Sequence, residues 1–194
     1  MSIYPLALFA HIVGVLGLFI AIGLQWTITV RLRRARSLAT VREWTSLVGG
    51  LFRLVPASGA LIMLAGMYMA AIAWNMTTPW IMVGFLMLLF LVALQFGVTL
   101  RRLRAIRRSA VELQFATSSI PEGLQHQIDD PLLWTAVQVL GTTAVGVVFL
   151  MTVKPDLAGS LLVLAVAVAL GAFSAQLWRR PRAARLPAPE AQVG

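Results

Sequence analysis

The chain has 194 residues, of which 59% are hydrophobic and only 12% are charged. This composition excludes a water-soluble domain, which carries roughly 25% charged residues. The net charge of +9 does not indicate nucleic-acid binding, because the positive residues stand in short runs beside apolar blocks. The lack of cysteine excludes disulfides, thiolate metal sites and a cysteine nucleophile.

The apolar residues form blocks of about 20 or more, the length of a helix that crosses a hydrocarbon core of roughly 30 Å. Backbone amides in lipid must bond within their own segment, so the blocks predict an all-α, polytopic membrane helix bundle over residues 1–178. About five transmembrane helices are expected. The predicted helices are 4–30, 44–74, 79–100 extending to about 116, a short surface helix at 120–127, 131–153 and 157–178.

The first two blocks are joined by a basic segment. The first block is too long for a signal-peptide core, so a retained helix is predicted. A run of arginines from Arg31 to Arg36 follows it. The second block begins amphipathic and becomes fully apolar from Leu54, and Pro56 is placed to bend it.

A tight turn leads to the third block, with Thr78 as the expected N-cap and Pro79 as the first helical residue. Arginines follow this block at once, interleaved with Leu103, Ile106 and Ala110 at helical spacing. We expect this helix to continue past the membrane with that apolar face along the headgroups. The arginines expected to contact lipid headgroups are Arg101, Arg104, Arg107 and Arg108.

The rest of the chain has clear start and stop signals. Ser119 and Glu122 have the spacing of a capping box, which predicts the short surface helix. Asp130 as N-cap and Pro131 start the fourth block, and the run Lys154-Pro155 ends it. Residues 179–194 are basic and rich in Pro and Ala, and we expect a disordered cytoplasmic tail.

The arginine runs predict the orientation. Five crossings place every Lys and Arg except Lys154 on one side, which should be cytoplasmic by the positive-inside rule. The N-terminus is therefore expected outside and the C-terminus in the cytoplasm. The tryptophans lie near the predicted helix ends, where indoles prefer the membrane interface.

Small and polar residues predict helix-packing seams, because such residues let two helices approach closely in lipid. In the first block they recur at steps that share one helical face. A similar seam lies in the second block, and a third in the fifth block at Ala165, Ala169 and Ala172. The seam residues of the first two blocks are His11, Gly14, Ala21, Gln25, Gly59 and Gly66.

His11 also has a second interpretation, because an ionisable residue inside a membrane is a candidate functional residue. Imidazole and thioether groups are ligands that Cu(I) accepts. The predicted depths would permit a copper site of His11 with Met67, and with Met63 or Met82. The alternative is a neutral histidine that hydrogen-bonds across the seam.

The motifs resemble a family of bacterial predicted integral membrane proteins, a domain of unknown function formed by a four-helix unit that ends in Lys-Pro. The likeness covers residues 4–155 and rests on His11, Arg53 to Pro56, Gly66, Thr78-Pro79-Trp80 and the segment 150–155 that ends in Lys154-Pro155. A more remote likeness links the first helix to membrane proteins of the copper-resistance D type. These resemblances imply a bacterial plasma membrane.

Three functions are compatible with the sequence. The first is a non-enzymatic membrane protein that associates through helices with a partner or with itself, in a bilayer with an anionic inner leaflet. It is preferred because no acidic residue, catalytic arrangement or phosphate loop lies in the apolar blocks, and no cofactor is then expected. The second is copper or haem binding through His11, and the third is a carrier of small solutes.

Overall fold

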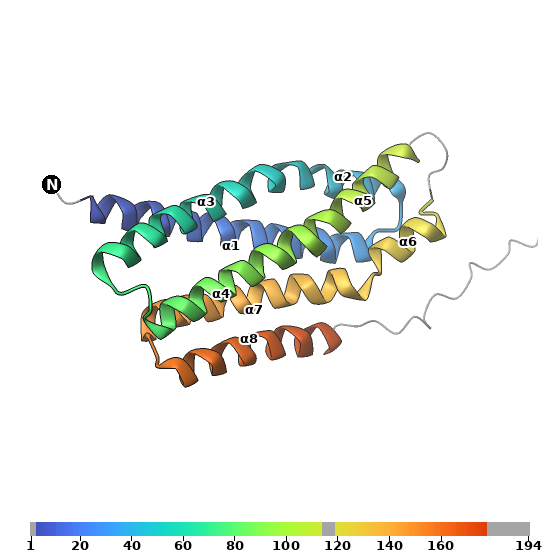
Figure 1. Cartoon of the computed structure of the whole chain (residues 1–194). Coiled ribbons are helices and arrows are strands. Elements are labelled where there is room, and N and C mark those ends of the chain that lie inside the picture. The colour runs from blue at the N-terminus through green and yellow to red at the C-terminus, as the bar shows by residue number, and fades with distance from the viewer. Residues whose placement is uncertain (1–2, 114–118, 178–194) are drawn as a thin grey trace, which may run out of the picture.

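The computed structural model describes residues 3–113 and 119–177. These residues form helices that lie side by side in one elongated bundle, without a strand (Figure 1). Five helical spans in this part of the chain are long and apolar enough to cross a membrane. The helices are α1 (Tyr4–Arg34), α2 (Leu38–Ser46), α3 (Val48–Ala73), α4 (Pro79–Leu94), the π-helical turn η1 (Gln95–Thr99), α5 (Leu100–Glu112), α6 (Glu122–Ile128), α7 (Pro131–Val153) and α8 (Leu157–Leu177).

Two helix boundaries differ from the sequence-based ranges. Helix α1 continues through the arginine run to Arg34, because arginine is a good helix former. The predicted helix 44–74 begins earlier than expected, at Leu38, and it is divided at Leu47 into α2 and α3. Ser37 caps α2, and its hydroxyl accepts a hydrogen bond from the backbone N–H of Thr40.

Ser119, the predicted N-cap, is not the residue that precedes the short surface helix. The short surface helix α6 starts at Glu122, and Pro121 stands at the N-cap position. Proline has no side-chain acceptor, so this helix begins without a side-chain cap. Residues 114–118, Trp178 and the predicted tail 179–194 lie outside the described residues.

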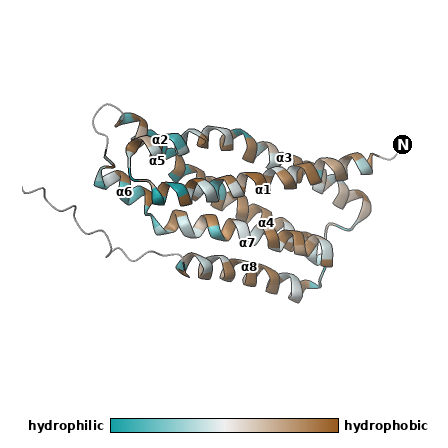
Figure 2. Ribbon diagram, turned by 180° about the vertical axis from the view of Figure 1, so that it is seen from behind, coloured by the Kyte–Doolittle hydropathy of each residue, from teal (hydrophilic) through white to brown (hydrophobic). Residues whose placement is uncertain are grey.

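The two ends of the bundle differ in chemistry (Figure 2). Helices α2, α5 and α6 gather at one end, together with the end of α1 and the start of α7; we call this the arginine end. The opposite end holds the start of α1, the turn between α3 and α4, and the turn between α7 and α8. Hydrophilic residues concentrate at the arginine end in Figure 2, while α3, α4, α7 and α8 are mostly apolar toward the opposite end.

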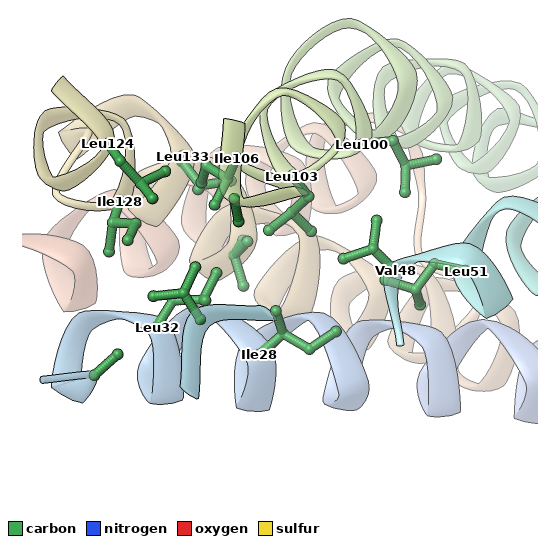
Figure 3. Close-up of a cluster of buried hydrophobic side chains, with 14 of the residues drawn as sticks. Ile28, Leu32, Val48, Leu51, Leu100, Leu103, Ile106, Leu124, Ile128 and Leu133 are labelled. Carbon is green, nitrogen blue, oxygen red and sulfur yellow. The ribbon is translucent and has the colours of Figure 1, made fainter. Parts of the chain in front are cut away.

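A hydrophobic core closes the arginine end (Figure 3). Leu103, Ile106 and Ala110 of α5 are at most 1% exposed, and they pack with Leu32 of α1 and Leu124 of α6. The expectation that this face of α5 lies along the lipid headgroups is therefore wrong. An amphipathic helix buries its apolar face against whatever apolar surface is nearest, and here α2, α3 and α6 lie closest to it.

The apolar part of the bundle is held by a few long helix pairs. Helix α1 packs along α3 and also contacts α7, while α8 packs along α7. Helix α4 packs against α7 and α8, and it makes no extensive contact with α3 in the described part of the chain. Helices α3 and α4 are therefore not packed along each other.

Candidate functional site

The seam between α1 and α3 is closed by small residues. A Cβ atom added to Gly14 would lie 2.9 Å from Cβ of Leu61 and 3.0 Å from the backbone nitrogen of Ile62. A Cβ added to Gly66 would lie 3.1 Å from Cε1 of His11. Gly14 thus lets the two helix backbones approach to a distance that a side chain would prevent, the usual role of small residues between membrane helices, and Gly66 leaves room for the His11 ring.

His11 is held inside this seam. Its side chain is buried, and Nδ1 lies 3.0 Å from the carbonyl oxygen of Ile62. Because a carbonyl oxygen only accepts, Nδ1 is the donor. The ring rests over Gly66. This geometry corresponds to the hydrogen-bonded alternative that the sequence left open for His11.

The other predicted seam residues have different positions. Ala21 and Gln25 are fully buried on α1. Gly59 does not pack against a neighbouring helix, since no atom lies within 4 Å of a Cβ added there. Instead, Gly59 lines a cavity, so its assignment to a packing seam is wrong: Gly59 lies seven residues from Gly66 and near the same face of α3, but the close contact at Gly66 does not extend to Gly59.

The methionines proposed as copper ligands are spread over different surroundings. Met67 and Met82 are exposed on the bundle surface, by 46% and 57%, and Met63 lines the cavity. Met82 belongs to α4, a helix that packs on α7 and α8 rather than on α1. His11 lies instead in the closed seam of α1 and α3.

At the end of the bundle opposite to the arginine end, the Thr78-Pro79-Trp80 motif lies close to the Lys154-Pro155 motif. Nζ of Lys154 lies 4.3 Å from the ring centroid of Trp74 and 5.7 Å from that of Trp80. The two indole rings are edge to face at 5.4 Å. Lys154 ends α7 with a left-handed backbone, φ 53°. Cation–π contact of this kind joins the turn after α3 to the turn after α7.

At the arginine end, several guanidinium groups stack on aromatic rings. Cζ of Arg104 lies 4.0 Å from the ring centroid of Phe52, and Cζ of Arg33 lies 4.9 Å from that of Trp134. Trp134 is buried in the protein rather than placed at an interface. Arg102 forms an ion pair with Asp130. The four arginines predicted to contact lipid are exposed: Arg101, Arg104, Arg107 and Arg108.

An apolar cavity of about 320 Å³ lies within the membrane-spanning part. Helices α3 and α4 flank it, and Leu18 and Ile22 of α1 and Leu140 of α7 line its inner wall. Ala60 of α3 and Phe96 of η1 also line it and are exposed. The cavity therefore opens sideways between α3 and α4, toward the surface that faces lipid.

Gln95 is the one polar side chain that lines this cavity. It is 3% exposed, and neither Nε2 nor Oε1 has a hydrogen-bond partner among the described residues. Burying an unpaired amide costs about 1–3 kcal/mol by mutational data. Gln95 also opens η1, and π-helical turns often occur at functional sites. Gln95 was not predicted as a functional residue, although a polar residue inside an apolar block was a usable signal.

Gln25 lies near the level of Gln95. A Cβ added to Gly141 of α7 would lie 3.8 Å from Ile22, and one added to Gly146 would lie 3.1 Å from Met87. Gln25 follows Ile22 by three residues and Gln95 follows Met87 by eight. Helix α7 runs antiparallel to α1 and α4, so residues further along α1 and α4 lie beside earlier residues of α7. Three residues before Gly141 and eight residues before Gly146 are the same position, 138. Gln25 and Gln95 therefore both lie at the level of residue 138 of α7. The amide groups of Gln25 are likewise buried and without a partner in the described residues.

No protein-family model, curated protein or solved structure matches this chain. The resemblance to the bacterial membrane-protein family therefore stays a prediction.

Proposed function

We propose that this protein is a non-enzymatic, multi-pass protein of the bacterial plasma membrane that associates through α8 with a transmembrane helix of a second copy or of a partner. The observation that carries the proposal is a stripe of small residues on α8 that the bundle leaves uncovered. Ala165 and Ala169 are exposed, and Ala172 is half-buried. Small residues four apart are the usual contact surface of associating membrane helices.

Helix α8 has two small-residue faces, and only one is used within the chain. Ala167, Gly171 and Ala175 are buried, and Gly171 packs on Val139 of α7. Residues two apart on a helix point about 200° apart. The stripe of Ala165, Ala169 and Ala172 therefore faces away from α7. Gly14 of α1 and Gly66 of α3, in contrast, are already in close contact within the chain.

The exposed arginines support an orientation with the arginine end in the cytoplasm. They also support contact with anionic lipid of the inner leaflet, where a basic residue near the surface contributes about 1 kcal/mol. The four arginines that would make this contact are exposed on α5, and Arg104 also stacks on Phe52.

The copper or haem alternative has weaker support from the geometry. Nδ1 of His11 already bonds the Ile62 carbonyl, and the exposed Met67 and Met82 do not share its seam. Association through α8 needs no rearrangement of the bundle, so it remains the preferred function.

A single cysteine on α8 tests the association, because the chain has no cysteine of its own. Phe173 lies on the same face as Ala169 and is 61% exposed. Oxidation of the Phe173→Cys variant in native membranes should give a cross-linked band, at twice the chain mass for a second copy or at another mass for a partner with a cysteine facing Phe173. Leu64→Cys, on an exposed face of α3, should remain monomeric.

A second variant links the band to the small residues. In the Phe173→Cys background, Ala165→Leu with Ala169→Leu should reduce the cross-linked fraction about tenfold, as a loss of roughly 1.4 kcal/mol predicts. Ala71→Leu is the matched control, since Ala71 is exposed on α3. A band that forms equally from Leu64→Cys, or that survives the double substitution, would refute association through this stripe.

A further inference from the structure

We propose that the cavity beside Gln95 binds a lipid-soluble molecule whose polar group is an uncharged carbonyl. This inference is independent of association through α8, because it concerns the opening between α3 and α4. Its first support is the polarity of the cavity. Gln95 is its one polar side chain, and no charged residue lines it. An apolar ligand without formal charge is the only kind that these walls accept without an unpaired buried charge.

The second support is the unpaired amide of Gln95. Buried donors are almost always paired in native proteins, whereas carbonyl oxygens with a free lone pair are more often tolerated. The donor Nε2 is thus the atom that most needs a partner, and it has none in the described residues. A carbonyl oxygen accepts from this donor, which explains why the ligand should carry that group.

The third support is depth. Gln95 precedes Arg101 by six residues, or about 9 Å by the helical rise. A carbonyl bonded to Gln95 would lie this far from the level of the arginines, within the apolar layer. The ester groups of bilayer phospholipids stay in the interfacial region. The ligand must therefore carry its carbonyl on an apolar body, as a prenylated quinone or a fatty acyl ester does.

The fourth support is size and access. A volume of about 320 Å³ is at the small end of ligand pockets, so it suits a head group or a short stretch of chain. The remainder of the molecule would leave between Ala60 and Phe96, which are exposed at the opening. Pro56 also lines the cavity, and a proline inside a helix removes a backbone bond and opens the packing around it.

Binding can be measured with the full chain in nanodiscs of saturated phosphatidylcholine. The probes are a menaquinone with four prenyl units and methyl oleate, which separate the two ligand sources. Native mass spectrometry counts bound probe. We expect one molecule of at least one probe per wild-type chain. Gln95→Leu should weaken its binding about fivefold, the value of one hydrogen bond of about 1 kcal/mol.

A steric variant tests the cavity itself. Gly59→Leu places a side chain in the cavity, and no atom lies within 4 Å of a Cβ at this position, so the fold should survive. It should abolish binding. Gly23→Leu is the matched control, since a Cβ at Gly23 is equally free of neighbours and the residue is outside the cavity; binding should equal that of the wild type.

The unfolding midpoint of each variant shows whether a loss of binding results from misfolding. Without probe, Gln95→Leu should unfold at or above the wild-type midpoint, because it removes an unpaired amide. Added probe should raise the midpoint of the wild type and of Gly23→Leu, but not that of Gly59→Leu. The proposal is overturned if the wild type binds neither probe, if Gly59→Leu binds as the wild type does, or if Gln95→Leu binds with unchanged affinity.

Discussion

His11 illustrates how this bundle accommodates a polar side chain. The imidazole donates to the Ile62 carbonyl at 3.0 Å, and Gly66 leaves room for the ring. A carbonyl oxygen has two lone pairs, so the Ile62 carbonyl can accept from His11 without giving up a helical hydrogen bond. Hydrogen bonds between membrane helices contribute about 0.6 kcal/mol on average, so His11 should act mainly by packing.

At this scale we predict the effect of His11→Ala. The variant loses one hydrogen bond and leaves a void, and it should destabilise the protein by about 1–2 kcal/mol. The thermal unfolding midpoint in detergent is the measurement. Phe9→Ala is the control on the same helix: Phe9 is 64% exposed, and the change should stay within about 0.5 kcal/mol.

The same preparations distinguish the packing role from copper binding. Bound copper is determined after exposure to Cu(I) for the wild type, His11→Ala and Met67→Leu. We expect no difference between the three. One copper per wild-type chain that disappears in both variants would show that His11 is a metal ligand and not a packing residue.

At the scale of elements, α7 and α8 are joined more tightly than their sequences suggest. A Cβ added to Gly171 would lie 2.6 Å from Cα and 2.9 Å from the backbone nitrogen of Val139. Backbone atoms cannot move aside as a flexible side chain can, so any larger residue must separate the two helices. A turn of only three residues between α7 and α8, 154–156, holds the pair together.

Gly171→Ala should therefore destabilise the α7–α8 pair, by about 1–3 kcal/mol as overpacking does. Gly84→Ala is the matched substitution, because no atom lies within 4 Å of a Cβ there. It should be neutral or stabilise by up to about 1 kcal/mol, since alanine favours a helix over glycine. Unfolding midpoints compare the two variants, and equal midpoints would contradict the close approach of α8 to Val139.

At the scale of the whole molecule, charge and aromatic residues divide the bundle into two ends. The arginine end adds α2, α5 and α6 to the membrane-spanning helices and has its own apolar core. At the opposite end, the Lys154 ammonium group contacts the rings of Trp74 and Trp80. The asymmetry of the basic residues is what the positive-inside rule uses to set orientation.

The orientation can be tested with single cysteines in intact cells. We expect Thr77→Cys to react with a membrane-impermeant thiol reagent, because Thr77 is exposed in the turn between α3 and α4. Ser109→Cys, in α5 at the arginine end, should react only after the cells are opened. Labelling of Ser109→Cys but not of Thr77→Cys in intact cells would reverse the proposed topology.

The sequence by itself determined the all-helical class and the number of membrane-spanning segments. Both follow from local rules: apolar length sets a crossing, and residues such as Pro79, Asp130 and Pro131 mark helix starts through their own backbone chemistry. For this reason the starts of α4 and α7 agree with the predicted ranges.

Only the tertiary structure decided which face of each helix meets protein. Rotation of a helix about its axis depends on all its neighbours at once. The apolar face of α5 therefore meets α6 rather than headgroups, and Gly59 lines a cavity rather than a seam. Gln95 could not be identified from the sequence because its surroundings also depend on the packing of several helices. Its residue type shows a polar group in an apolar helix, but only the packing of four helices around it leaves that group buried and without a partner.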